Sequence, residues 1–255
     1  MKIDLNCDMG ESFGEYVLGN DAAIMPYITS VNIACGFHAG DPNVMARTVQ
    51  LAKQMDVAVG AHPGYPDLNG FGRRNMSLSV EEIENMILYQ VGALAAFTRA
   101  NGVELRHVKP HGALYNQAAV DGFIAQAVAR GVKRFSHSLI LVGLAGSLLL
   151  AKGQEEGLQT ASEGFPDRAY LPDGRLMPRN QPNALVDSPE EIALNALRLA
   201  QDGIRIDKSG VVDYVPVETL CLHGDNPVAV ENARLISRIL PEAGIKLIPL
   251  TMENK

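Results

Sequence analysis

Four histidines in this chain share one sequence setting. Each of them ends an apolar, strand-like run and has a glycine one or two residues further on: His38, His62, His111 and His223. Imidazole titrates near neutral pH and is also a common metal ligand, so these side chains are candidates for proton transfer or metal binding. One such histidine is more often structural, but its fourfold recurrence favours a function.

Carboxylates, an amide and a lysine occupy similar positions. Asn6, Asp8 and Glu11 lie at the end of the first apolar run, and Glu163 ends a later one. Lys109 lies two residues before His111, so both side chains share one face of an extended backbone. A buried ammonium needs a carboxylate or a ligand beside it, and burial by itself lowers its pKa. These features favour a functional lysine.

Two kinds of site fit these residue types. In a divalent-metal site, imidazoles and a carboxylate would hold the ion, and the expected ligands are His38, His62 and Asp8 because they follow neighbouring runs. In a metal-free pocket, carboxylates and histidines would transfer protons while Lys109 neutralises an anionic substrate. Asp41, which precedes a proline, is explained as a helix cap. The common zinc-protease, P-loop, dinucleotide and serine-hydrolase motifs are absent from the sequence, although a missing P-loop does not exclude ATP.

The spacing of the runs indicates how these residues are positioned. One helix fits between successive runs, which predicts parallel strands whose polar ends meet at one edge. At 255 residues the chain has the usual size of a single barrel domain. We therefore expect one α/β domain over 1–255, an irregular parallel (β/α) barrel of about seven strands. A doubtful eighth strand begins at Lys246.

Helix signals are strongest at two capping boxes. Ser79 and Ser188 each precede an acidic residue by three positions and predict helices that end at Asn101 and Gly203. A further helix after His111 is expected to end at Gly131. Residues 164–187 are rich in proline and arginine, which predicts a long loop that is either a functional lid or disordered.

Composition restricts the class of partner. The net charge of −7 and pI near 5.4 argue against a nucleic-acid-binding protein. The first residues lack a signal-peptide pattern, and no run approaches the length of a membrane span. Three cysteines without a CxxC pair indicate reduced thiols. We expect a soluble, cytoplasmic protein that does not bind a membrane.

Six stretches of the sequence resemble the LamB/YcsF family. They are DLNCDMGESFG (4–14), NIACGFHAGD (32–41), AHPGYPD (61–67), VKPHGALY (108–115), EGFPDRAY (163–170) and LHGD (222–225). The resemblance implies hydrolytic opening of the 5-oxoproline lactam to L-glutamate, with ATP as co-substrate and two further subunits, B and C, as partners. It also implies a barrel similar to the glycoside hydrolase/deacetylase type.

Roles for that reaction follow from residue chemistry. We expect catalysis by Asp8, Lys109, His111, Glu163 and His223, and substrate binding by Asn6, Glu11 and Arg168. Either Asp8 or Glu163 is the base, and Arg168 grips the substrate carboxylate. Two alternatives stay open: a metal-dependent deacetylase or amidase with the same residues, and a noncatalytic subunit that binds substrate.

Overall fold

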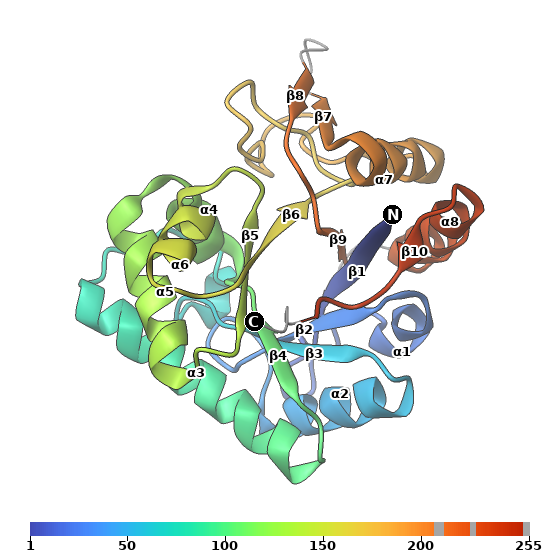
Figure 1. Cartoon of the computed structure of the whole chain (residues 1–255). Coiled ribbons are helices and arrows are strands. Elements are labelled where there is room, and N and C mark those ends of the chain that lie inside the picture. The colour runs from blue at the N-terminus through green and yellow to red at the C-terminus, as the bar shows by residue number, and fades with distance from the viewer. Residues whose placement is uncertain (207–211, 225–227, 252–255) are drawn as a thin grey trace.

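Seven parallel strands form a closed barrel in the computed structural model, which describes residues 1–206, 212–224 and 228–251 (Figure 1). The ring contains β1 (Lys2–Met9), β2 (Ser30–Ala34), β3 (Ala58–His62), β4 (Leu105–Val108), β5 (Ile140–Leu144), β6 (Thr160–Gly164) and β9 (Thr219–His223). Neighbours pair in that order, and β9 closes the ring by pairing with β1. The predicted parallel (β/α) barrel is confirmed.

Three further strands lie outside the ring. β7 (Ile204–Ile206) and β8 (Val212–Tyr214) form an antiparallel pair, and residues 207–211 between them lie outside the described part of the chain. The doubtful eighth run forms only β10 (Lys246–Leu247), which pairs with the first residues of β1. The last run of the chain therefore extends the sheet beside β1 without entering the barrel.

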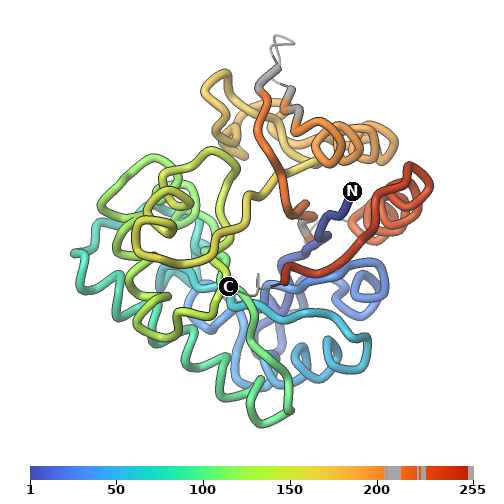
Figure 2. Tube along the Cα trace, viewed as in Figure 1, coloured from blue at the N-terminus to red at the C-terminus, as the bar shows by residue number. Residues whose placement is uncertain are grey.

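Helices surround the barrel, and Figure 2 shows the chain passing once around it from the blue N-terminal strand to the red C-terminal helix. They are α1 (Asp21–Ile24), α2 (Pro42–Gln54), α3 (Val80–Ala100), α4 (Gly112–Val120), α5 (Gly122–Phe135), α6 (Leu148–Glu155), α7 (Pro189–Asp202) and α8 (Ala229–Glu242). No helix among the described residues is long and apolar enough to cross a bilayer.

The predicted helix caps are present. Asp41 Oδ1 accepts the backbone N–H groups of Asn43 and Val44 at the start of α2. Ser79 and Glu82 form the reciprocal capping box of α3. The Ser188 hydroxyl accepts from the backbone N–H of Glu191 in the first turn of α7. Each cap satisfies donors that the first helical turn leaves unpaired. Local sequence therefore determines these boundaries.

The expectation that Gly131 ends a helix is wrong. Two helices, α4 and α5, follow His111, and α5 continues through Gly131 to Phe135. A Cβ on Gly131 would lie 2.8 Å from Ile87 Cβ and 3.0 Å from the Glu84 carbonyl oxygen of α3. The glycine is a contact point between two closely packed helices, and a local propensity argument does not detect that role.

Gly131→Ala should therefore destabilise the protein although alanine is the better helix former. We expect the clash with α3 to lower the free energy of unfolding by about 1–3 kcal/mol. Gly92→Ala in α3 is the matched control, because no heavy atom lies within 4 Å of its added Cβ, and it should raise stability by up to about 1 kcal/mol. Urea unfolding of both variants measures the difference. Equal effects would contradict the packing explanation.

Candidate active site

β1 supplies a row of polar side chains to the interior of the barrel. Ile3, Leu5, Cys7 and Met9 belong to the apolar core, whereas Asp4, Asn6 and Asp8 alternate with them and are buried polar residues. Alternation along an extended strand sends the two sets to opposite faces. The inward hydrogen bonds of Asp4, Asn6 and Asp8 show that these three residues share the face that points into the barrel.

Asp4 and Asn6 form the deepest part of this network. Asp4 accepts hydrogen bonds from the hydroxyls of Thr29 and Ser30, both at 2.6 Å, and from that of Thr219 at 2.5 Å. Asn6 Nδ2 donates to Glu163 Oε1 at 3.0 Å. Burial raises the pKa of Asp4 to about 6, even though the three hydroxyl donors oppose the shift.

Lys109 lies between two buried carboxylates. Its Nζ is 2.8 Å from Asp8 Oδ1, 2.9 Å from Glu163 Oε1 and 2.9 Å from Cys221 Sγ. Burial works against the ammonium, but Asp8, Cys221 and Glu163 outweigh it and raise the pKa of Lys109 well above its usual value. The sequence-based expectation of a lowered pKa is wrong because the sequence does not reveal that these partners lie beside it. Lys109 is a fixed cation.

The two carboxylates are not equivalent. Glu163 is fully buried and accepts hydrogen bonds from Asn6, Lys109 and the Tyr115 hydroxyl, the last at 2.7 Å. Asp8 Oδ1 accepts from Lys109 and from Asn32 Nδ2, and Asp8 also lines the main pocket, which Glu163 does not. Of the two residues predicted as the base, Asp8 is therefore the one that lines the pocket, and Glu163 contacts Lys109 without lining it.

Three of the four histidines gather beside Asp8. His38 stacks on His111 with ring centroids 3.7 Å apart, and His62 lies edge-on to both rings. Burial, with the neighbouring imidazoles, lowers the pKa of His38 and of His111 well below the usual value. His38 and His111 are therefore neutral at pH 7.

The metal-ligand set expected from the sequence differs from the group that the structure assembles. His38 and His62 do come together, but with Glu11 and His111, and the ligand atoms of these four residues lie within 4.8 Å of one another. Asp8 lies beside this group, with its Oδ2 at 3.3 Å from His62 Nε2. The buried His/Glu group has donors of the type that hold a metal ion.

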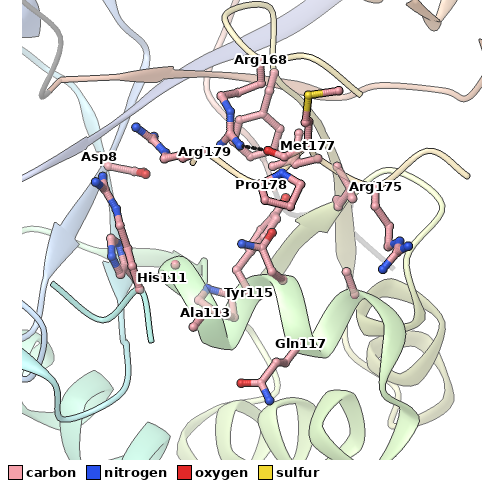
Figure 3. Close-up of a pocket in the computed structure, with 18 of the residues that line it drawn as sticks. Asp8, His111, Ala113, Tyr115, Gln117, Arg168, Arg175, Met177, Pro178 and Arg179 are labelled. Carbon is pink, nitrogen blue, oxygen red and sulfur yellow. Dashed lines mark hydrogen bonds between the residues drawn. The ribbon is translucent and has the colours of Figure 1, made fainter. Parts of the chain in front are cut away.

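A pocket of about 650 Å³ opens above these residues. Asp8 and His111 line one side of it, and Arg168, Met177 and Arg179 of the long loop after β6 are among the residues on the other (Figure 3). Lys109, which contacts Asp8, also lines the pocket. The prediction that this loop belongs to the site is thus supported by its position. In Figure 3 the side chain of Arg179 extends toward Asp8.

Arg168 is placed differently from its expected role. Its Nη2 donates to the Met177 carbonyl at 2.6 Å and its Nε to the Ala184 carbonyl at 3.4 Å. Burial lowers its pKa to about 10. Because one edge of the guanidinium is committed to the loop backbone, a bidentate grip on a substrate through that edge is excluded. Arg168 lines the pocket but principally fixes the loop.

His223 ends β9, where its backbone is paired in register with Asp8. This places the fourth histidine position at the same end of the barrel as the other three. Its side chain lies outside the described part of the structure, so its predicted role stays a prediction.

Comparison with known proteins identifies the family. The LamB/YcsF family matches residues 3–255. The chain belongs to the LamB/YcsF family. A protein from Pyrococcus horikoshii, named as the A subunit of 5-oxoprolinase, is 55% identical over 251 residues, which are 98% of each chain. Another of that name, from Methylococcus capsulatus, is 54% identical and covers 97% of this chain and 95% of its own.

A solved structure agrees with this assignment. The crystal structure of a lactam utilization protein from Thermus thermophilus superposes with a TM-score of 0.93 at 47% identity, covering 98% of this chain and all of the other. The LamB/YcsF resemblance of the six short stretches therefore extends over the whole barrel.

Some residues in and around the site of this LamB/YcsF chain were not predicted from its sequence. Arg73 and Arg179 line the pocket, but arginines in polar loops look like solvated side chains in sequence. Asn32 bridges Asn6 and Asp8, and Tyr115 donates to Glu163. The position of Asn32 within an apolar run was the signal that could have identified it.

Asp4 gives this LamB/YcsF barrel a pH-dependent stability. The carboxyl ionises near 3.8 in the unfolded chain and near 6 in the folded protein, so its contribution to stability is lost as the pH rises between those values. Relative to Asp4→Asn, the wild type should lose about 3 kcal/mol of unfolding free energy from pH 4 to above pH 6. Urea unfolding across this range measures the difference. Parallel pH profiles would contradict a raised Asp4 pKa.

Proposed function

We propose that this chain is the lactam-opening subunit of an ATP-dependent 5-oxoprolinase and acts in the cytoplasm together with subunits B and C. Two relatives support this assignment by their names, and they are 55% and 54% identical to this chain over nearly its whole length. The substrate would be 5-oxoproline, and the products L-glutamate, ADP and inorganic phosphate.

The chemistry explains the need for ATP. Amide resonance makes an unstrained lactam carbonyl a poor electrophile. Phosphorylation of the lactam oxygen by ATP in the complex would remove that resonance and create a leaving group. Water then adds to the carbon, and the ring C–N bond breaks to leave an acyl phosphate and a free amine. A second water hydrolyses the acyl phosphate and releases inorganic phosphate. The site must accept a proton from water, balance negative charge and return a proton to the ring nitrogen.

The observation that carries the proposal is Lys109, held between Asp8 and Glu163 at the edge of the pocket. Its fixed charge is suited to stabilising the oxyanion or phosphate. The neutral His111 ring beside it adds no charge. Asp8 is the base for water. Glu163 is a positioning residue, and its hydrogen bonds to Asn6 and Tyr115 keep its oxygens directed at Lys109. His223 would protonate the ring nitrogen.

The substrate carboxylate requires a cation on the opposite side of the pocket. Arg179 satisfies this requirement because it lines the pocket from the long loop and extends toward Asp8 (Figure 3). Arg168 supports the same loop through the Met177 carbonyl. We therefore assign carboxylate binding to Arg179, with Arg168 as the residue that positions it.

Removing the fixed charge should abolish most turnover. In the reconstituted complex, Lys109→Met and Asp8→Asn should each lower kcat by about 100-fold or more, because both act on the transition state. Lys152→Met is the matched control, since this lysine forms an ion pair with Glu155 on α6 and does not line the pocket. Steady-state glutamate formation measures the effect after folding and assembly are verified.

Near-wild-type turnover in both variants would contradict this mechanism. It would favour instead the noncatalytic alternative, in which the chain only binds substrate for the other subunits. Activity of the isolated chain on amides without ATP would favour the deacetylase or amidase alternative, for which the buried His/Glu group is the supporting observation.

Substitutions of Arg179 and Arg168 should have different effects on kinetics and stability. Arg179→Lys should raise KM for 5-oxoproline about 10-fold with little change in kcat, because it removes ground-state binding. Arg168→Lys should also lower the melting temperature, since it loses hydrogen bonds from a charged donor to two loop carbonyls. Kinetics and thermal unfolding of both variants test this. If Arg168→Lys raised only KM and Arg179→Lys lowered the melting temperature, Arg168 would be the binding residue and Arg179 the positioning residue.

A further inference from the structure

Two ring nitrogens of the histidine group beside Asp8 face each other. His62 Nδ1 lies 2.7 Å from the Lys109 carbonyl oxygen, and His111 Nε2 lies 2.8 Å from that of Phe71. A carbonyl oxygen only accepts, so both of these nitrogens carry the proton. The other two nitrogens, His62 Nε2 and His111 Nδ1, lie 3.0 Å apart, and each has a lone pair when its ring holds a single proton. Asp8 Oδ2 lies 3.3 Å from His62 Nε2.

Two lone pairs at this distance repel unless a positive charge lies between or beside them. A proton shared by the two rings is one solution, and a metal ion is the other. Metal-binding histidines commonly donate their outer N–H to a backbone carbonyl, which fixes the tautomer and directs the inner nitrogen at the ion. His62 and His111 both have this arrangement.

His38 decides between the two solutions. It is fully buried, and within the described part of the chain neither ring nitrogen has a hydrogen-bond partner. A proton shared by His62 and His111 leaves this polar ring unexplained, although unpaired buried groups are costly. Glycines at 64 and 72 make room for it, because a Cβ at either would lie 2.7 Å from a His38 atom. The fold therefore accommodates an imidazole here without a hydrogen-bond partner among residues 1–206, 212–224 and 228–251.

Glu11 completes the donor set with a carboxylate. Its Oε1 lies 3.8 Å from His111 Nδ1 and 3.9 Å from His38 Nε2. In a tetrahedral zinc site, ligand bonds of about 2.1 Å place the donor atoms about 3.4 Å apart. The donor atoms lie within 4.8 Å of one another, so the longest separations would need to shorten by about 1.4 Å, while the 3.0 Å between His62 and His111 would lengthen slightly. His38 would also need to turn out of its stack on His111.

We propose that Glu11, His62 and His111, with His38 as the fourth ligand, form a binding site for a divalent transition metal of the zinc class. Three imidazoles and one carboxylate suit zinc, cobalt or nickel better than magnesium or calcium, which prefer oxygen ligands. Glu11, His62 and His111 line the main pocket, so the ion would be accessible from it. The site is independent of the proposed function, because it follows from the donor geometry alone.

Metal binding can be measured on the isolated full-length chain, without ATP or other subunits. With any histidine tag removed and the protein treated with chelator, we expect one equivalent of Co²⁺ to bind and produce the visible absorption of a low-coordinate site, and Zn²⁺ to displace it. Glu11→Gln and His111→Ala should each weaken Co²⁺ binding at least about 10-fold. His137→Ala is the matched control, because His137 is outside the donor group, and it should leave binding unchanged.

A second measurement on the wild type covers the case in which the variants do not fold. Nitrogen-15 spectra of the histidine rings should show the Nδ1–H tautomer for His62 and the Nε2–H tautomer for His111. Zn²⁺ should then shift their unprotonated nitrogens while leaving His107, which contacts Asn32, unchanged. Loss of binding in His137→Ala, no stoichiometric binding, or a doubly protonated His62 ring that Zn²⁺ leaves unaltered would each overturn the proposal.

Discussion

The buried ammonium of Lys109 is the interaction on which the interior of this barrel depends. Removing a charge from water costs several kcal/mol, and an ion pair offsets that cost only when its geometry is good and its remaining donors and acceptors are satisfied. Here two carboxylates, Asp8 and Glu163, contact the same Nζ. The loss of either carboxylate would leave a buried charge poorly compensated. The stability of the barrel and the chemistry of the pocket therefore depend on the same residues.

That constraint extends through the barrel in layers. Glu163 is held by Asn6 and Tyr115, and Asn6 also donates to Thr219, which in turn donates to Asp4. Each residue satisfies the hydrogen-bonding groups of the next, as a buried polar network requires. The network holds the Lys109 side chain from the barrel interior, and the pocket reaches the same side chain from the opposite direction. A preorganised charge of this kind stabilises a transition state without reorganisation during the reaction.

The two sides of the pocket have different physical characters. The barrel side is rigid, because its side chains come from paired strands and their immediate ends. The other side is the long loop after β6, which is held by its own backbone hydrogen bonds and by those from Arg168 to the Met177 and Ala184 carbonyls. A molecule in the pocket would therefore lie between side chains positioned by the barrel strands and side chains positioned by this loop.

The sequence by itself determined the features that depend on neighbouring residues. The strand positions, the caps at Asp41, Ser79 and Ser188, and the common face of Asp4, Asn6 and Asp8 all follow from residues within a few positions of one another. Only the tertiary structure decided which groups meet: Asn6 and Glu163 are 157 residues apart, and Lys109 and Cys221 are 112 apart. The role of Gly131 and the pKa of Lys109 were misjudged for the same reason. A pKa, a close helix contact or a ligand set depends on atoms brought together by folding, and local periodicity contains no information about those distances.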